Sequence, residues 1–207
     1  MKNILASAIG IWLLAGLFVS AAVSETDLSD IQMRLLKSDM LRADFQQEKN
    51  LRALSRPLLS QGELLFIAGE GALWRVVEPF AVAVLMKSDE IIEWDDEGGM
   101  RRVDTNLNPV LHTLGEIILA TLAGDTQFLK QIFDVSPTVS EHGWGLFLKP
   151  KSEELGAVIS DVQIFGDHFV EQVLIRETNG DITKLQFSHF GVGPFELNEF
   201  EQRHFSQ

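Results

Sequence analysis

The sequence predicts an α+β fold in which one large antiparallel sheet carries helices on one of its faces. Apolar residues recur in many short runs that suit strands, and turn residues separate these runs. Segments with helical spacing are few, and they lie at the start and in the middle of the chain. The order of elements is therefore helix, strands, helices, strands, which is typical of an α+β arrangement.

The first 24 residues have the pattern of a secretory signal peptide. Met1–Asn3 is a short positive region, residues 4–19 are almost entirely apolar, and small residues follow up to Ser24. An uncleaved membrane anchor is the alternative, but the apolar run is short for a span and small residues flank it. We therefore expect cleavage after Ser24, which leaves residues 25–207 as a single domain outside the cytoplasm.

The first predicted helix covers residues 28–43. Its apolar residues fall near helical spacing, and Ser24, Thr26 or Asp27 can cap its start. From Asp44 the pattern changes to closely spaced strands, which predicts an antiparallel meander. These strands are expected over residues 45–54, 58–68, 72–77, 81–87, 90–95 and 100–104.

Two helical segments then interrupt the strands. Residues 110–122 are unusually apolar and predict one helix, and Asp125 starts a shorter helix that runs through Ile132. The Asn179-Gly180 pair is a strong hairpin signal, because these residues accept the positive φ values of a tight turn. The remaining strands are expected over residues 133–139, 143–148, 159–165, 169–177 and 181–190, with a last short strand within 195–205.

The chain is acidic and contains no cysteine. Lys and Arg number 17 and Asp and Glu number 30, so the formal net charge is −13. A surface this acidic is a poor partner for nucleic acid and for anionic lipid headgroups, so we expect a soluble protein that does not bind membranes on its own. The absence of cysteine excludes thiol catalysis, thiolate metal sites and lipidation at a cysteine after the signal.

A series of short motifs follows a definite order along the chain. The motifs are Phe45-Gln46-Gln47, Gly62-Glu63-Leu64, Trp74, Pro79, Ser88-Asp89, Trp94, Leu146–Pro150, Asn179–Thr183 and Phe187. Their order and spacing resemble the outer-membrane lipoprotein carrier (LolA) family, whose signature includes Phe-x-Gln, Gly-x-Leu, Phe-x-Trp and a following Pro. The resemblance covers nearly all of residues 25–207.

The resemblance implies an incomplete antiparallel barrel, covered by helices, whose cavity takes the acyl chains of a lipoprotein or another lipid-linked cargo. It also implies a periplasmic carrier that receives this cargo from an inner-membrane exporter and passes it to an outer-membrane receptor. We expect a monomer that needs no cofactor and does not bind nucleic acid.

Two departures from the family point to a divergent paralogue. The family commonly has Arg-Pro where this chain has Ala68 and Gly69, and that arginine ties the helical lid down in the empty state. The family's latch is therefore not expected to work in the same way here. We also expect the chain to lack the C-terminal extension of the housekeeping carriers.

A carrier of this kind needs an apolar cavity and no catalytic groups. We expect the sheet to line this cavity with Leu64, Phe66, Trp74, Val76, Val84, Met86, Ile92 and Trp94. We expect a lid of Leu111, Leu114, Ile118 and Leu122, and a far wall of Phe147, Phe169, Val173 and Phe187. A register error of one residue would turn a wall residue outward.

Two other functions stay open. The same apolar residues suit a closed core, and the chain would then be a non-catalytic accessory or regulatory module of the cell envelope. Hydrolysis at an unrecognised site is the third possibility, but no nucleophile–base motif supports it. The histidines lack metal-ligand spacing, and Asp95-Asp96-Glu97 has the pattern of a solvated turn. We therefore expect no catalytic residue and no metal site.

Overall fold

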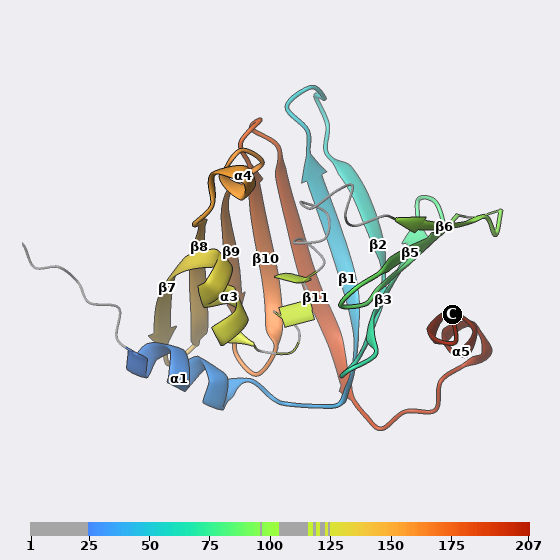
Figure 1. The fold of residues 1–207 in the computed structure, drawn as a ribbon, viewed down its shortest axis with the longest axis horizontal. Helices are drawn as coiled ribbons and strands as arrows, with labels where there is room; N and C mark the ends of the chain where they lie inside the picture. Colours follow the sequence, from blue (N-terminus) through green and yellow to red (C-terminus); the bar gives the residue numbers. More distant parts are fainter. Residues whose placement is uncertain (1–24, 96, 104–115, 118, 121–122, 124) are drawn as a thin grey trace, which may run out of the picture.

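The computed structural model describes residues 25–207, apart from 96, 104–115, 118, 121–122 and 124. The predicted signal peptide lies outside the described residues. One 11-stranded sheet forms the centre of the molecule, with the strand order β6-β5-β4-β3-β2-β1-β11-β10-β9-β8-β7 (Figure 1). Because the sheet is antiparallel, curved and accompanied by few helices, the predicted α+β class is confirmed.

The sheet consists of two meanders. The first contains β1 (Met40–Asn50), β2 (Leu58–Ile67), β3 (Gly71–Glu78), β4 (Val82–Met86), β5 (Ile91–Trp94) and β6 (Met100–Val103). The second contains β7 (Phe133–Ser140), β8 (Gly143–Pro150), β9 (Ile159–Gly166), β10 (Val170–Glu177) and β11 (Ile182–Val192). Antiparallel pairing of β1 with β11 joins the two meanders, and β6 and β7 form the edges. The sheet is therefore an unclosed half-barrel with a concave and a convex face.

The helices are α1 (Glu25–Arg34), α3 (Thr126–Ile132), α4 (Glu153–Gly156) and α5 (Glu199–Phe205). Figure 1 shows α1 and α3 on the concave side of β7 to β10, α4 at the opposite end of these strands, and α5 beyond β3. Among the described residues, no helix has the length and the apolar character that a membrane span needs.

The predicted helix over residues 28–43 is wrong in its second half, because α1 ends at Arg34 and β1 begins at Met40. Leu41, Ala43 and Phe45 are buried and alternate with less buried neighbours, which is the period of a strand. In the connection, the Ser38 hydroxyl donates a hydrogen bond to the Met40 carbonyl at 2.7 Å. The Ser38 side chain thus provides hydrogen bonds to the backbone of Met40, beyond the end of α1.

Two local predictions in the second half of the chain are confirmed. Asp125 caps α3, since its carboxylate accepts hydrogen bonds from the backbone N–H groups of Gln127 and Phe128. A tight turn joins β10 to β11, and Gly180 has a φ of +95°. Asn179 contributes differently from the prediction, because its side-chain oxygen accepts a hydrogen bond from the Asp181 N–H at 2.8 Å.

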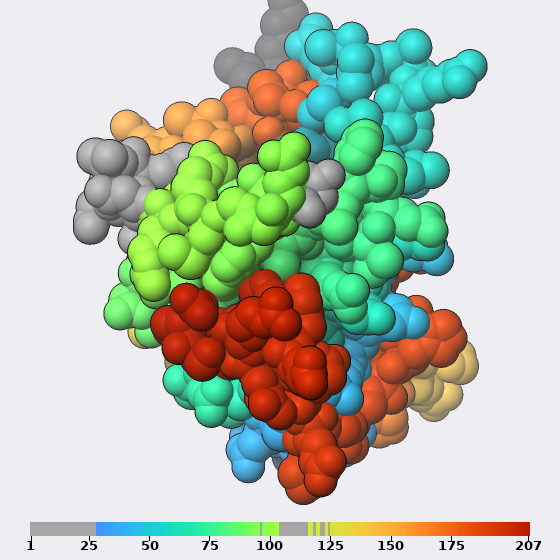
Figure 2. Space-filling view, turned by 90° about the vertical axis from the view of Figure 1, so that its right-hand side faces the viewer, coloured from blue at the N-terminus to red at the C-terminus, as the bar shows by residue number. Residues whose placement is uncertain are grey.

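The short strand predicted within residues 195–205 is wrong, since α5 occupies this segment. Asn198 accepts a hydrogen bond from the Glu201 N–H at 2.9 Å, and the Glu201 carboxylate accepts one from the Asn198 N–H at 2.8 Å. This capping box is visible in the sequence as Asn-x-x-Glu, the signal that identifies the helix. In Figure 2 the C-terminal segment lies against the outer side of the first meander.

Apolar side chains pack on both faces of the sheet. The larger cluster covers the concave face and includes residues of α1 and α3. The smaller cluster covers the convex face, and Leu197, Phe200 and Phe205 of the C-terminal segment pack against it. Neighbouring residues such as Leu64 and Leu65 enter different clusters, because successive strand residues point to opposite faces.

Candidate functional site

The concave face of the sheet presents a continuous apolar surface. Leu41 and Phe45 on β1, Leu64 and Phe66 on β2, and Trp74 on β3 belong to one cluster, and each is at most 9% exposed. These residues occupy alternate strand positions, so their side chains point to the same face. Residues of β8, β9 and β10 continue the surface into the second meander.

Most of the predicted cavity residues lie in this concave cluster. These are Leu64, Phe66, Trp74, Val76, Val84, Met86, Phe169, Val173 and Phe187. Val76, Val84 and Phe169 are only partly buried. The concave face therefore keeps accessible apolar surface, which an apolar ligand can cover.

The placement of Ile92 and Trp94 on the concave face is wrong. Both residues belong to the convex cluster, where the Trp94 ring lies 4.3 Å from the His204 ring of α5. Ile91 faces the concave side instead, and it is 6% exposed. β5 is covered on both faces, so its Ile-Ile pair does not indicate which residue points inward.

The placement of Phe147 in the far wall is also wrong. Its side chain is 39% exposed and makes an edge contact with Phe165 at 5.8 Å. The neighbouring Leu146 and Leu148 are buried in the concave cluster. The alternation of β8 thus turns Phe147 to the opposite face.

The four predicted lid residues, Leu111, Leu114, Ile118 and Leu122, lie outside the described residues. The described residues of the same apolar segment include Ile117 and Ala120, which are 3% and 8% exposed. Both belong to the concave cluster, and Leu119 packs against it. Part of this segment therefore covers the concave face.

A cavity of about 310 Å³ opens at the end of the concave face near the C-terminus of α1. Its apolar lining comes from four separate parts of the chain: Leu35, Leu36 and Leu41, then Phe66 and Ala68, then Ala123, and then Phe169 and Val170. Its polar rim contains Gln32, Lys37, Ser38, Asp39 and His168. Leu41, Phe66 and Val170 are the buried members of this lining. A mostly apolar chamber with a polar rim suits a ligand with a hydrocarbon tail and a polar head.

Polar contacts hold α1 over the mouth of this cavity. The Leu36 N–H donates to the His168 carbonyl at 2.9 Å, and the Arg34 guanidinium lies 3.6 Å from the Asp167 carboxylate. The His168 ring nitrogen Nδ1 lies 3.2 Å from the Arg34 carbonyl oxygen. These contacts connect the end of α1 to the turn between β9 and β10, so this turn and α1 together define the mouth.

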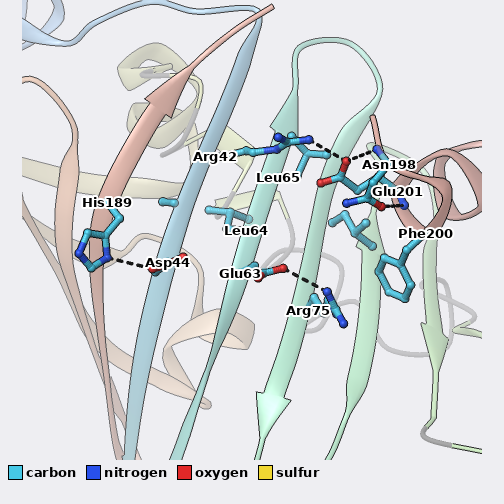
Figure 3. A pocket seen from close by; sticks show the side chains of 12 residues that line it. Arg42, Asp44, Glu63, Leu64, Leu65, Arg75, His189, Asn198, Phe200 and Glu201 are labelled. Carbon is cyan, nitrogen blue, oxygen red and sulfur yellow. Dashed lines mark hydrogen bonds and ion pairs between the residues drawn. The ribbon is translucent and has the colours of Figure 1, made fainter. Parts of the chain in front are cut away.

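A second pocket, of about 320 Å³, lies on the convex face beside α5 (Figure 3). Its ionisable side chains lie in pairs: Arg42–Glu201 at 2.7 Å, Arg75–Glu63 at 3.2 Å and His189–Asp44 at 2.9 Å. None of its lining residues is a serine, threonine or cysteine. The pocket therefore offers paired charges but no hydroxyl or thiol nucleophile.

No group of three or more metal-ligating side chains occurs in the part of the chain that the structure describes. Asp95, in the carboxylate run of the sequence, accepts hydrogen bonds from the N–H groups of Glu97 and Gly99. Its carboxylate thus stabilises the turn between β5 and β6.

Sequence reasoning missed Leu35, Leu41 and Val170 as cavity residues. Leu41 could have been found, because Leu41, Ala43 and Phe45 alternate in the manner of a strand. No local signal identifies Leu35 or Val170. These two residues meet in the cavity only because the end of α1 lies beside β10.

Comparisons with known proteins agree with this architecture. The family model for LolA-like outer membrane lipoprotein carrier proteins matches residues 20–186. No curated protein sequence matches significantly.

Several solved structures are similar to this one. A LolA superfamily protein from Nitrosomonas europaea is 9% identical, with a TM-score of 0.47, and the match covers 85% of this chain and 96% of that one. A putative outer membrane lipoprotein-sorting protein domain from Vibrio parahaemolyticus is 12% identical, with a TM-score of 0.48 and coverages of 88% and 99%. A DUF1329 family protein from Desulfovibrio piger is 11% identical, with a TM-score of 0.50 and coverages of 87% and 97%. At these identities the similarity concerns the fold alone.

Proposed function

The chain belongs to the LolA-like family of outer membrane lipoprotein carrier proteins, and from this premise we propose that it is a non-catalytic periplasmic carrier of acylated cargo. The cargo is a lipoprotein or another lipid-linked molecule whose acyl chains enter the concave side of the half-barrel. The carrier receives it from an inner-membrane exporter and delivers it to an outer-membrane receptor.

The cavity between α1 and the concave face is the observation that supports this proposal most directly. Its lining residues Leu41, Phe66 and Val170 are apolar and buried, whereas Lys37, Asp39 and His168 stand at the rim. Each methylene removed from water contributes about 0.8 kcal/mol, so a long acyl chain contributes on the order of 10 kcal/mol before the costs of binding. The polar rim leaves the head of the cargo in water.

Ala68 stands in the lining of this cavity at the position where the family's arginine is expected, and Ala123 lines the same cavity. Two small side chains leave space that a long side chain would fill. We infer that this space accepts part of the acyl chain and that the α1 contacts with Asp167 and His168 hold the mouth instead of an arginine at position 68.

Mass spectrometry of organic extracts from protein purified from its own periplasm tests the proposal directly. Bound acyl species are expected.

Uptake of a fluorescent fatty acid supplies the quantitative readout. Ala68→Phe is expected to exclude about two methylenes from the cavity and to weaken uptake about tenfold. Ala81→Phe is the matched control, because Ala81 is also exposed but lines a pocket on the convex side.

Equal affinities in the wild type and in Ala68→Phe would reject this cavity as the binding site. Protein without extractable lipid and without fatty-acid uptake would instead support the second candidate, an accessory or regulatory module of the envelope with a filled core. Cleavage after Ser24 is part of the proposal, and N-terminal sequencing of the protein from the periplasm tests it.

A further inference from the structure

The hairpin between β1 and β2 differs in charge from the rest of the chain. Residues 49–59 contain Lys49, Arg52 and Arg56 but no Asp or Glu, although acidic residues outnumber basic ones by 30 to 17 in the whole chain. No described residue forms an ion pair or hydrogen bond with the guanidinium of Arg52 or Arg56. Both cations are exposed and available to a partner.

The same hairpin exposes leucine side chains. Leu54, Leu58 and Leu59 are 50%, 50% and 64% exposed. Leu58 and Leu59 are consecutive strand residues, so their side chains point to opposite faces of the hairpin, and Leu54 lies near its tip. Apolar surface therefore surrounds the hairpin and is not confined to one side.

The paired part of the hairpin extends beyond β3 (Figure 1). Pairing of β2 with β3 stops at Gln61, whereas pairing of β2 with β1 continues to Leu58. Residues 58–60 thus overhang β3 by roughly 10 Å at about 3.3 Å per residue. On the other side, β11 pairs with β1 up to Asn50, the last residue of β1, so only the loop residues 51–57 follow this pairing. Figure 2 shows the hairpin, in cyan, projecting from the top of the molecule.

Contacts at its base hold the hairpin in this position. The Arg52 N–H donates to the Asp181 carboxylate at 2.7 Å, and the Lys49 ammonium lies 3.3 Å from the Glu177 carboxylate. The Leu54 N–H donates to the Leu51 carbonyl at 2.9 Å. Asp181 and Glu177 are thus engaged at the base of the hairpin, while Leu54 and Arg56 lie nearer its tip.

We propose that residues 50–59 dock the protein onto an anionic phospholipid surface. Arginine contacts phosphate groups while leucine enters the interface, and leucines on all sides suit a fluid layer better than one side of a protein partner. On the β3 side the overhang of roughly 10 Å exceeds the screening length of about 8 Å at physiological ionic strength, so acidic groups on that side oppose the contact little, and on the β11 side Glu177 is paired with Lys49. The net charge of the whole chain predicts poor binding to anionic headgroups, but it does not reflect the local excess of positive charge on this hairpin.

Vesicle flotation of the purified protein tests the proposal without any cargo, so its outcome is independent of fatty-acid uptake. Binding is expected to vesicles that contain phosphatidylglycerol but not to pure phosphatidylcholine vesicles, and it is expected to weaken as salt is added. The double variant Arg52→Glu/Arg56→Glu is expected to lose at least about tenfold in affinity. Leu54→Gln/Leu59→Gln is also expected to bind more weakly.

The matched control is Lys149→Glu/Arg203→Glu, which changes the net charge by the same amount at two exposed cations away from the hairpin. This control is expected to bind like the wild type, and circular dichroism verifies that each variant is folded. Absence of wild-type binding at low salt would overturn the proposal. Equal losses in the hairpin and control variants would overturn it too, because they would indicate a general charge effect.

Discussion

The rings of Phe45 on β1 and Trp74 on β3 lie 3.9 Å apart between centroids and are inclined by 32°, although β2 separates the two strands. The residue of β2 that pairs with Phe45 is Gly62. Because glycine has no side chain, the two rings meet above its backbone. Phe187 on β11 adds an edge contact to Trp74 at 6.0 Å. An aromatic group thus anchors the middle of the concave face.

Truncation of Phe45 tests the importance of this aromatic contact. Phe45 is 1% exposed, so Phe45→Ala leaves a cavity and is expected to lower the free energy of unfolding by about 3–5 kcal/mol. Urea denaturation followed by far-UV circular dichroism measures the change. Phe80→Ala is the control, because Phe80 is 72% exposed, and a change within about 0.5 kcal/mol is expected there. Similar losses in both variants would contradict the role of the aromatic contact.

A side chain at Gly62 is expected to disturb the pairing of β2 with β3. A Cβ atom at this position would lie 1.8 Å from the carbonyl oxygen of Arg75, so the strands would have to separate. Gly62→Ala is expected to lower the free energy of unfolding by about 2 kcal/mol or more, as measured by thermal denaturation. Gly156→Ala in α4 meets no atom within 4 Å and is expected to be neutral or slightly stabilising. A neutral Gly62→Ala would show that the strands adjust without cost.

Trp94 and Phe66 are expected to differ in their effect on ligand binding. Trp94 packs with α5 on the convex face, so Trp94→Ala is expected to lower stability by about 1–3 kcal/mol but to change fatty-acid affinity less than about twofold. Phe66 lines the cavity, and Phe66→Ala is expected to change the affinity clearly. A fluorescent fatty-acid titration of both folded variants makes the comparison. Loss of uptake in Trp94→Ala alone would place binding on the other side of the sheet.

Glu201 is expected to hold α5 against the sheet. Its carboxylate accepts hydrogen bonds from Arg42 at 2.7 Å and from the Asn198 N–H at 2.8 Å, and Arg42 Nε is already buried without a partner. Glu201→Ala is therefore expected to destabilise α5 by about 1–3 kcal/mol. Hydrogen exchange at the amides of residues 199–205 measures this local opening.

Glu199→Ala is the control for this experiment. Glu199 lies in the first turn of the same helix and is exposed, so a loss of no more than about 0.5 kcal/mol is expected. Equal exchange rates in the two variants would show that the contact with Arg42 contributes nothing to the position of α5.

Local patterns in the sequence determined most of the strands, the start of α3 at Asp125 and the turn at Gly180. These features depend on alternation and on residues with fixed backbone preferences, which act over a few positions. The same patterns placed Leu64, Phe66 and Trp74 on one face of the sheet.

Where both faces of the sheet are covered, only the tertiary structure decided to which face each apolar residue points. Ile91 and Ile92 are equally apolar, and only the packing of α5 on the convex face shows that Ile92 points away from the concave side. The cavity beside α1 likewise depends on residues from distant segments, such as Leu35, Ala68 and Val170. Local propensity carries no information about such contacts, because they form only when β1 pairs with β11 and brings the two meanders together.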